Sequence, residues 1–301
     1  MRQQPVIAVV GPTAAGKSDL AVDIALRLGG ECVNADSMQL YRGMDIGTAK
    51  LTPVEQRGVH HHLLDVWDVT VTASVAEYQK LARAVIDSVE VAVLVGGSGL
   101  YVRAAIDELE FPGTDPEIRA RLEGELAERG PAPLYERLRE QDPAAAAAIL
   151  PSNGRRIVRA LEVIEHTGRP FSATMPGYDA VYPSVQIGLD VPRPELDERI
   201  AVRVERMWQA GLVDEVRSLL GQGLAEGRTA SRALGYAQVI RFLEGEWSEE
   251  QAIEETVRAT RRFARRQESW FRRDPRVRWL PYDAPDLLER SLALISAHPF
   301  A

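Results

Sequence analysis

The sequence has very little cysteine and no long hydrophobic run. Cys32 is the single cysteine among 301 residues, which excludes an intrachain disulfide and favours a reducing compartment. No stretch approaches the roughly 20 apolar residues that a membrane span needs. A strand-like apolar run follows the N-terminus at once, where a signal peptide would require a segment of its own. We therefore expect a cytoplasmic protein with no membrane partner.

Net positive charge is also lacking, because the formal net charge is −8, and that value does not suggest a nucleic-acid-binding protein. The charge is uneven, however, since the segment 256–278 holds nine arginines and only two acidic residues. This segment follows the acidic run EGEWSEEQAIEE. Acidic residues near the start of a helix and basic residues near its end both interact favourably with the helix dipole, so one interpretation is a solvent-exposed helix end. Arginines interleaved with Phe263, Trp270 and Phe271 are also what RNA phosphates and unstacked bases require, and we expect this segment to contact RNA.

The clearest motif is GPTAAGKS, which matches the phosphate-binding pattern G-x-x-x-x-G-K-[ST] at every fixed position. Its backbone N–H groups and the following helix start attract phosphate oxygens, and the Ser18 hydroxyl would bind Mg²⁺. Only three of the 36 lysine and arginine residues are lysine. Lysine offers a compact charge that fits between phosphate oxygens. We therefore interpret Lys17 as a residue that binds phosphate, since the composition of the chain favours arginine. The predicted phosphate-binding residues are Gly11, Pro12, Thr13, Ala14, Ala15, Gly16, Lys17 and Ser18.

Such loops usually hold ATP or GTP, but two accompanying motifs of those proteins are missing. No lysine follows an asparagine, so the guanine-reading sequence N-K-x-D does not occur. The run LVGG stands where a Walker B strand would end in aspartate. These absences disfavour a GTPase or a motor ATPase and leave open which phosphate compound is bound.

Two other segments follow predicted strands. The strand 31–36 delivers Asp36 and Ser37 to the sheet edge beside the phosphate loop, where Asp36 has three interpretations: a general base, a partner of Mg²⁺, or the cap of an ordinary turn. The stretch VLVGGSGLY, residues 93–101, places Ser98 after two glycines. That serine indicates either a contact to phosphate or to a leaving group, or a packing turn.

The order of elements predicts an α/β fold with a P-loop NTPase-like parallel sheet flanked by helices. The predicted strands are 5–10, 31–36, 89–97, 185–191 and an edge strand at 277–282, and helices are predicted at 17–28 and 74–88. Because ligands of such sheets lie beyond the carboxyl ends of the strands, the three polar segments should meet there.

Only helical patterns occur between residues 115 and about 178. They cover 115–130, 133–141, 142–150 and 152–168, with N-caps at Asp115 and at Ser152 or Asn153, and with stops at Gly130 and Gly168. We predict a core domain from residues 1–112 and 181–301 and a helical insertion domain at 113–180. Within it the cluster Arg155, Arg156 and Arg159 stands at a helix start, where positive charge opposes the dipole and hints at an anionic partner.

Three consecutive histidines, His60 to His62, raise the question of a metal site. Adjacent residues point in different directions on a strand or a helix, and no cysteine partner has the spacing of a zinc site. A turn or a hydrogen-bonding role is therefore the preferred interpretation. Four tryptophans, Trp67, Trp208, Trp247 and Trp270, lie in apolar patterns and are predicted to be in the core.

Eight stretches in chain order carry a resemblance: GPTAAGKS, DSMQLYRGMDIGTAK, HHLLD, LVGGSGLY, DPEIRARLE, RRIVRALEV, RALGYAQ and RRFARRQESWFRRD. With them the chain resembles the bacterial tRNA dimethylallyltransferases (tRNA isopentenyltransferases) over almost its full length. The resemblance implies transfer of a dimethylallyl group from dimethylallyl diphosphate to the exocyclic amine of adenosine 37, with release of diphosphate. That adenosine is 3′-adjacent to the anticodon in tRNAs that read codons starting with U. The resemblance also implies Mg²⁺, binding of the anticodon stem-loop, and a cytoplasmic monomer.

Carried over onto this sequence, the resemblance assigns roles to single residues. It implies that Asp36, Lys17 and Ser98 are catalytic, with Asp36 as the base on the target amine and Thr13 to Ser18 around the diphosphate. Ser98 stands where the family usually has threonine, and it keeps the hydroxyl; Ala237 stands where a basic residue is common and is given no RNA contact. The implied tRNA-binding residues are Asp36, Ser37, Met38, Gln39, Ser98, Arg119, Arg155, Arg156, Arg159, Arg232, Gly235 and Tyr236.

Three alternatives remain open at this point. A small-molecule kinase with ATP as donor explains the phosphate loop and Asp36, but not the arginine clusters. An adenylate isopentenyltransferase uses the same donor with a free nucleotide, and would not need the helical insertion. An RNA-binding module with a structural phosphate loop would lack catalysis.

Overall fold

The computed structural model describes residues 6–174 and 177–298, which leaves Pro5 of the predicted first strand outside the described residues. The chain forms two compact units, one of Met1–Ile106 with Ala180–Ala301 and one of Asp107–Asp179. The insertion was predicted at 113–180. Within the described ranges, none of the helices combines the length and apolar character that crossing a lipid bilayer requires.

The larger unit is built on a six-stranded sheet in which every strand pairing is parallel, in the order β3-β2-β4-β1-β5-β6. Its strands are β1 (Val6–Val10), β2 (Glu31–Asn34), β3 (His61–His62), β4 (Ala92–Gly96), β5 (Ser184–Asp190) and β6 (Val277–Pro281). Its α-helices are α1 (Lys17–Leu28), α2 (Pro53–Gln56), α3 (Val75–Ile86), α4 (Gly99–Ile106), α9 (Arg193–Gln209), α10 (Leu212–Leu220), α11 (Tyr236–Leu243), α12 (Glu249–Phe271) and α13 (Leu287–Ala297). Two 3-10 helices, η2 (Leu224–Glu226) and η3 (Ala230–Arg232), precede α11. The predicted α/β class is confirmed, with the phosphate loop between β1 and α1 as in P-loop NTPase-like folds.

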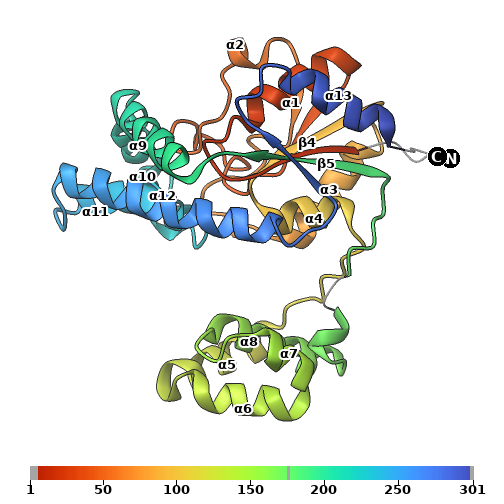
Figure 1. Ribbon diagram of the computed structural model, residues 1–301. Helices are drawn as coiled ribbons and strands as arrows, with labels where there is room; N and C mark the ends of the chain where they lie inside the picture. The colour runs from red at the N-terminus through yellow and green to blue at the C-terminus, as the bar shows by residue number, and fades with distance from the viewer. Residues whose placement is uncertain (1–5, 175–176, 299–301) are drawn as a thin grey trace. The chain divides into compact units, whose positions relative to one another are not determined.

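Helices cover both faces of the sheet, which explains why the central strands β1 and β4 are uniformly apolar. All five residues of β1 are buried. Ile7 and Val9 belong to a core cluster that includes residues of α1, α9 and α13, while α3 and α4 lie on the opposite face (Figure 1). This arrangement holds β1 rigidly, so the loop that follows it starts from a fixed point.

The smaller unit is helical. It contains α5 (Pro116–Arg129), α6 (Pro131–Gln141), α7 (Pro143–Ala148), α8 (Gly154–Thr167) and the 3-10 helix η1 (Phe171–Thr174). Leucines 122, 134, 138 and 161 lie at the centre of its own core cluster. Asp115 and Asn153 accept hydrogen bonds from the first-turn N–H groups of α5 and α8, as their capping signals predicted.

Some expectations were wrong or incomplete. Helix α4 begins within LVGGSGLY, a stretch for which a packing turn was one of two interpretations. The hydrogen-bonding role expected for the histidines is confirmed at His61 and His62, but these two residues form the short strand β3 rather than a turn. Trp270 is 40% exposed rather than in the core. Its indole ring lies against Gly99, where an added Cβ would come within 2.1 Å of the ring, so glycine at the start of α4 makes room for this contact.

Candidate active site

The carboxyl ends of β1, β2 and β4 border a polar cavity of about 680 Å³, here called the first cavity. Five predicted phosphate-binding residues line it: Thr13, Ala14, Gly16, Lys17 and Ser18. Gly11, Pro12 and Ala15 are buried. Asp36 and Gln39 line the same cavity, so segments that are far apart in the sequence meet at this edge of the sheet.

The phosphate loop takes a backbone shape that few residues adopt. Gly11, Ala14 and Gly16 have φ values of 135°, 64° and 94°, a region that favours glycine and is strained for alanine. Gly16 precedes the first turn of α1 without a side-chain cap, which leaves the N–H groups at the helix start available for an anion.

Two side chains from distant helices hold this loop. The Arg199 Nε atom donates to the Ala14 carbonyl oxygen at 2.8 Å. The Thr13 N–H donates to Gln267 Oε1 at 2.9 Å, and Gln267 Nε2 donates to the Gly97 carbonyl oxygen at 2.9 Å. Gln267 is buried and therefore links the loop after β1 to the loop after β4.

Positive charge is concentrated around Lys17. Its Nζ atom donates to the Pro12 carbonyl oxygen at 2.6 Å. Burial and the neighbouring Arg203 lower the pKa of Lys17 to about 8, while the Asp36 carboxylate acts in the opposite direction. Burial also lowers the pKa of Arg203, and Asp36 opposes this shift. Two cations and one carboxylate thus share a poorly hydrated region, which favours a multiply charged anion.

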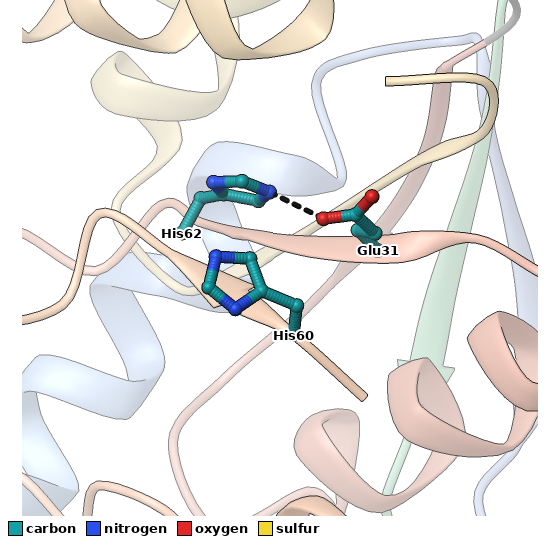
Figure 2. A group of neighbouring side chains, drawn as sticks. All are labelled: Glu31, His60 and His62. Atoms are coloured by element: carbon teal, nitrogen blue, oxygen red, sulfur yellow. Dashed lines mark hydrogen bonds and ion pairs between the residues drawn. The ribbon is translucent and has the colours of Figure 1, made fainter. Parts of the chain in front are cut away.

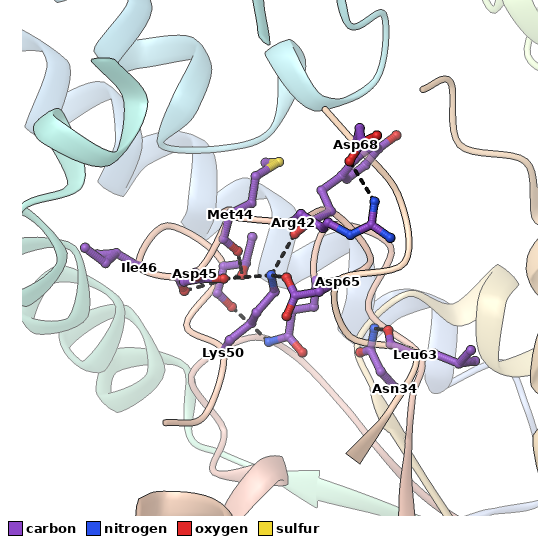
Figure 3. A network of polar contacts seen from close by, with 12 residues as sticks. Asn34, Arg42, Met44, Asp45, Ile46, Lys50, Leu63, Asp65 and Asp68 are labelled. Carbon is purple, nitrogen blue, oxygen red and sulfur yellow. Dashed lines mark hydrogen bonds and ion pairs between the residues drawn. The ribbon is translucent and has the colours of Figure 1, made fainter. Parts of the chain in front are cut away.

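Asp36 sits in a turn that Asn34 builds. The Asp36 N–H donates to Asn34 Oδ1 at 2.8 Å, and the Asn34 amide donates to the Asp36 carbonyl oxygen at 3.0 Å. The same amide donates to the Leu63 carbonyl oxygen at 3.0 Å (Figure 3). One Asp36 carboxylate oxygen accepts from the Met38 N–H at 3.0 Å. The turn therefore orients the carboxylate, which still borders the first cavity.

Ser98 and Ser37 connect the ends of β4 and β2. Their hydroxyl oxygens lie 3.3 Å apart, and the Ser37 N–H donates to Ser98 Oγ at 3.3 Å. The two glycines before Ser98 have no room for a side chain, since an added Cβ would lie 2.3 Å from the Ala35 carbonyl oxygen at Gly96 and 2.2 Å from Gln267 at Gly97. The Gly-Gly pair thus permits this close approach of segments.

A second cavity of about 320 Å³ shares Thr13, Asp36, Thr48 and Arg203 with the first. Ser37, Met38, Arg232 and Gly235, all predicted from the sequence, line it. Apolar side chains contribute to its wall: Met38, Ile200, Val204, Met207, Leu234 and Phe263. A polar and a more apolar cavity therefore meet at Asp36 and Arg203.

The loop 42–50 beside these cavities is held by two charged side chains. The Lys50 ammonium, almost fully buried, donates to the Tyr41 carbonyl oxygen at 2.6 Å and to the carboxylates of Asp45 and Asp65 at 2.7 and 2.6 Å (Figure 3). The Glu215 carboxylate accepts three backbone N–H groups of the loop, those of residues 45, 46 and 47. Gln39 donates to the Thr48 carbonyl oxygen at 3.0 Å, which joins this predicted tRNA-binding residue to the same loop.

Tyr236 does not lie where the prediction of a tRNA contact requires. Its side chain is fully buried, its ring fills the space above Gly47, and its hydroxyl donates to Glu215. The structure gives it an internal role, since it orients the carboxylate that holds the loop 42–50.

Arg119 and Arg159 in the smaller unit are partly buried and make internal contacts. Both donate to Glu162, whose side chain is fully buried, and Arg159 also donates to the carbonyl oxygens of Pro112 and Gly113. Burial raises the pKa of Glu162, but hydrogen bonds from the two arginines outweigh it and lower that pKa overall. In this structure both arginines hold Glu162, and their assignment to tRNA stays a prediction.

The other predicted arginines are exposed. Arg155 and Arg156 lie on the surface of α8, and Arg232 lies on the surface beside the second cavity. Within the segment 256–278, Arg272 lies 3.9 Å above the Trp279 ring and pairs with Asp190. Some arginines of that segment therefore make contacts within the protein, while Arg262 and Arg278 are exposed.

The sequence reasoning missed Arg199, Arg203 and Gln267 as parts of the site. The two arginines lie on α9 and the glutamine lies in the basic stretch of α12. No local motif marks the arginines in a chain so rich in arginine. The glutamine stands in the recognisable run RRFARRQESWF, which was interpreted for its charge alone.

The chain is similar in sequence to known proteins of one family. The model of the IPP transferase family matches residues 39–274. The chain is 72% identical over 302 residues to the tRNA dimethylallyltransferase of Thermobifida fusca, covering 97% of this chain and 95% of that protein. It is 73% identical over 288 residues to the tRNA dimethylallyltransferase of Streptomyces avermitilis, covering 94% and 92%.

Solved structures give the same result. The full-length tRNA isopentenylpyrophosphate transferase of Bacillus halodurans is 39% identical, with a TM-score of 0.74 and coverage of 98% of this chain and 97% of that chain. A eukaryotic dimethylallyltransferase that acts on tRNA superposes with a TM-score of 0.83 over 98% of this chain and 80% of its own, at 23% identity. The latter likeness concerns the fold alone.

Proposed function

Because the chain belongs to the IPP transferase family, we propose that it is a tRNA dimethylallyltransferase, an enzyme of tRNA modification. It transfers a dimethylallyl group from dimethylallyl diphosphate to the exocyclic amine of adenosine 37, next to the anticodon, in tRNAs that read codons starting with U. The observation that carries this proposal is the meeting of a polar and an apolar cavity at Asp36 and Arg203. The diphosphate of the donor needs a polar, positively charged cavity, whereas its five-carbon group and the acceptor adenine need a more apolar one.

In this proposal the first cavity holds the diphosphate against residues 13–18, with Lys17 and Arg203 beside it. The second cavity receives the five-carbon group and the acceptor base. As the amine nitrogen bonds to the first carbon of the dimethylallyl group, the carbon–oxygen bond to diphosphate breaks. Asp36 takes the amine proton, and diphosphate leaves with the electrons of the broken bond. Ser98 and Ser37 position the end of β2 beside this reaction.

Mg²⁺ fits the oxygen donors of the first cavity, since its preferred ligands are hydroxyl, carboxylate and phosphate oxygens. Ser18 and Asp36 both line that cavity, and we propose that the Ser18 hydroxyl holds the ion. When bound, Mg²⁺ supplies positive charge that stabilises the departing diphosphate.

The proposed partner is the anticodon stem-loop of tRNA. Exposed arginines at positions 155, 156, 232 and 262 offer charges for its phosphates, and residues 37–39 and Gly235 lie beside the position proposed for the flipped base. Both cavities are lined by this single chain, which supports a functional monomer. One buried cysteine, Cys32, suits the reducing conditions of the cytoplasm.

One experiment separates this proposal from its rivals. The protein is offered unmodified tRNA, AMP and a panel of kinase substrates, with dimethylallyl diphosphate or ATP, and the products are weighed. We expect a single five-carbon addition to tRNA alone, and Lys17→Ala should slow it by orders of magnitude without unfolding the protein. A prenylated AMP would indicate an adenylate isopentenyltransferase, and a phosphorylated small molecule would indicate a kinase; either result would overturn the proposal.

A further inference from the structure

Two of the three consecutive histidines share a face at the edge of the sheet. Alternate residues of an extended chain point the same way, so His60 and His62 project to one side while His61 projects to the other. The parallel pairing of Cys32 with His61, together with the bond from the Cys32 N–H to the His60 carbonyl oxygen, places Glu31 at the matching position on β2. The sequence reasoning considered adjacent histidines and did not consider this cross-strand partner.

The three side chains converge on one point (Figure 2). One ligand atom from each of Glu31, His60 and His62 lies within 4.8 Å of the other two. The His62 Nε2 atom is 2.7 Å from Glu31 Oε2, and the two histidine rings stand at 86° with centroids 4.2 Å apart. His60 is exposed and the other two are partly exposed, so an ion has access from solvent.

Neighbouring groups do not compete for this point. The His61 Nδ1 atom lies 2.9 Å from the Val59 carbonyl oxygen, and its ring borders the first cavity. Cys32 is fully buried in the core cluster, and it points away from Glu31 because successive residues of a strand face opposite sides. The cluster is therefore separate from the proposed catalytic residues.

We propose that Glu31, His60 and His62 form a binding site for a divalent transition-metal ion of the zinc class. Two imidazole nitrogens and one carboxylate oxygen are ligands that zinc accepts, with water in a fourth position. Metal–ligand bonds of about 2.0–2.2 Å put tetrahedral ligand atoms roughly 3.4 Å apart. The separations found are at most 4.8 Å, so side-chain movements of roughly 1 Å complete the geometry.

The consequence of binding is structural. Strand β3 has only two residues and pairs with β2 alone, so little holds it in the sheet. An ion shared by Glu31 and the two histidines would fasten β3 to β2. Because His61 and Leu64 border the first cavity, this connection would also stabilise one wall of it.

The test uses the full chain without a histidine tag. Cobalt(II) is titrated while its visible ligand-field absorption is recorded, and zinc(II) affinity is measured by competition with a chromophoric chelator. We expect one equivalent to bind and the melting temperature to rise with zinc. Each of Glu31→Gln, His60→Gln and His62→Gln should weaken binding at least about tenfold, whereas the exposed His166→Gln should behave as wild type.

Two results would overturn the proposal. One is wild-type protein that binds no cobalt or zinc at micromolar concentrations. The other is full affinity in Glu31→Gln, since two histidines alone would then account for binding. His60 is exposed, so His60→Gln tests the site even where another variant folds poorly, and circular dichroism checks each variant.

Discussion

Lys17 should make diphosphate binding weaken as pH rises through about 8. Burial and Arg203 lower its pKa from the usual 10.5 to about 8, which corresponds to about 3 kcal/mol of cost for keeping the lysine charged before an anion binds. A bound diphosphate favours the charged form. Above pH 8, binding must therefore be accompanied by proton uptake, and the apparent affinity falls.

The magnitude follows from the fraction of protonated lysine. With a pKa of about 8, that fraction falls from about nine-tenths at pH 7 to about one-tenth at pH 9, which predicts a loss of affinity of about tenfold. Inorganic pyrophosphate binding is measured by calorimetry at pH 7, 8 and 9 for wild type and Lys17→Met. Pyrophosphate itself also titrates, but the ratio of the two affinities cancels that contribution.

Two matched variants complete the design. Lys80→Met removes an exposed lysine and should leave the pH profile unchanged. Arg203→Gln removes the neighbouring charge that lowers the pKa of Lys17, so binding should be weaker overall but its decline should move to higher pH. A wild-type to Lys17→Met affinity ratio that stays constant from pH 7 to 9 would refute the reasoning.

Three further predictions concern single side chains. Asp36→Asn should slow single-turnover transfer to tRNA by about 10²- to 10⁴-fold, the range for loss of a general base, while calorimetry still detects pyrophosphate binding. Gln267→Ala removes one buried and one partly buried hydrogen bond, worth about 2 kcal/mol together, and should lower kcat/KM by up to about 30-fold, whereas the exposed Gln209→Ala should have no effect. Glu162→Gln should destabilise the smaller unit by about 3 kcal/mol at pH 7, seen as faster hydrogen exchange in 107–179. The Glu162 pKa is lowered in the folded state, so its stabilisation is present at neutral pH and lost as the pH falls into the acid range, where the two proteins should converge.

The parts of the fold that depend on local signals could be predicted from the sequence. The apolar run before GPTAAGKS, the helix beginning at Lys17 and its Gly29 stop depend on residues within a few positions of one another, and β1 and α1 were predicted closely. Helices α5, α7 and α8 of the smaller unit were predictable for the same reason, since each begins with a side-chain cap of its own. Strand β3 could not be predicted, because two histidines have little strand propensity and form a strand only by pairing with β2.

The sequence predicted only those parts of the candidate site whose residues lie close together in a short motif. The phosphate loop and Asp36 follow strands and carry recognisable spacing. Arg203 and Gln267 reach the site from helices that are distant in the sequence. No motif marks Arg203 among the many arginines, and the run around Gln267 was interpreted for its charge alone. Tyr236 shows that a recognised motif does not by itself give a residue's role. It lies in the stretch RALGYAQ and was assigned to tRNA, whereas in the structure its hydroxyl orients Glu215.

The pairing of Lys17 with Arg203 explains how a common phosphate loop can favour a departing diphosphate. Burial first, and repulsion from Arg203 second, lower the pKa of Lys17, so keeping both groups charged in this poorly hydrated site is costly. A monophosphate relieves only part of that repulsion, whereas a diphosphate has enough charge to neutralise both groups. As the carbon–oxygen bond breaks, negative charge grows on the diphosphate oxygen, so the relief is greater in the transition state than with the bound donor. In the proposed reaction, release of this electrostatic cost would therefore contribute to catalysis, and it would act on the leaving group rather than on the dimethylallyl chain.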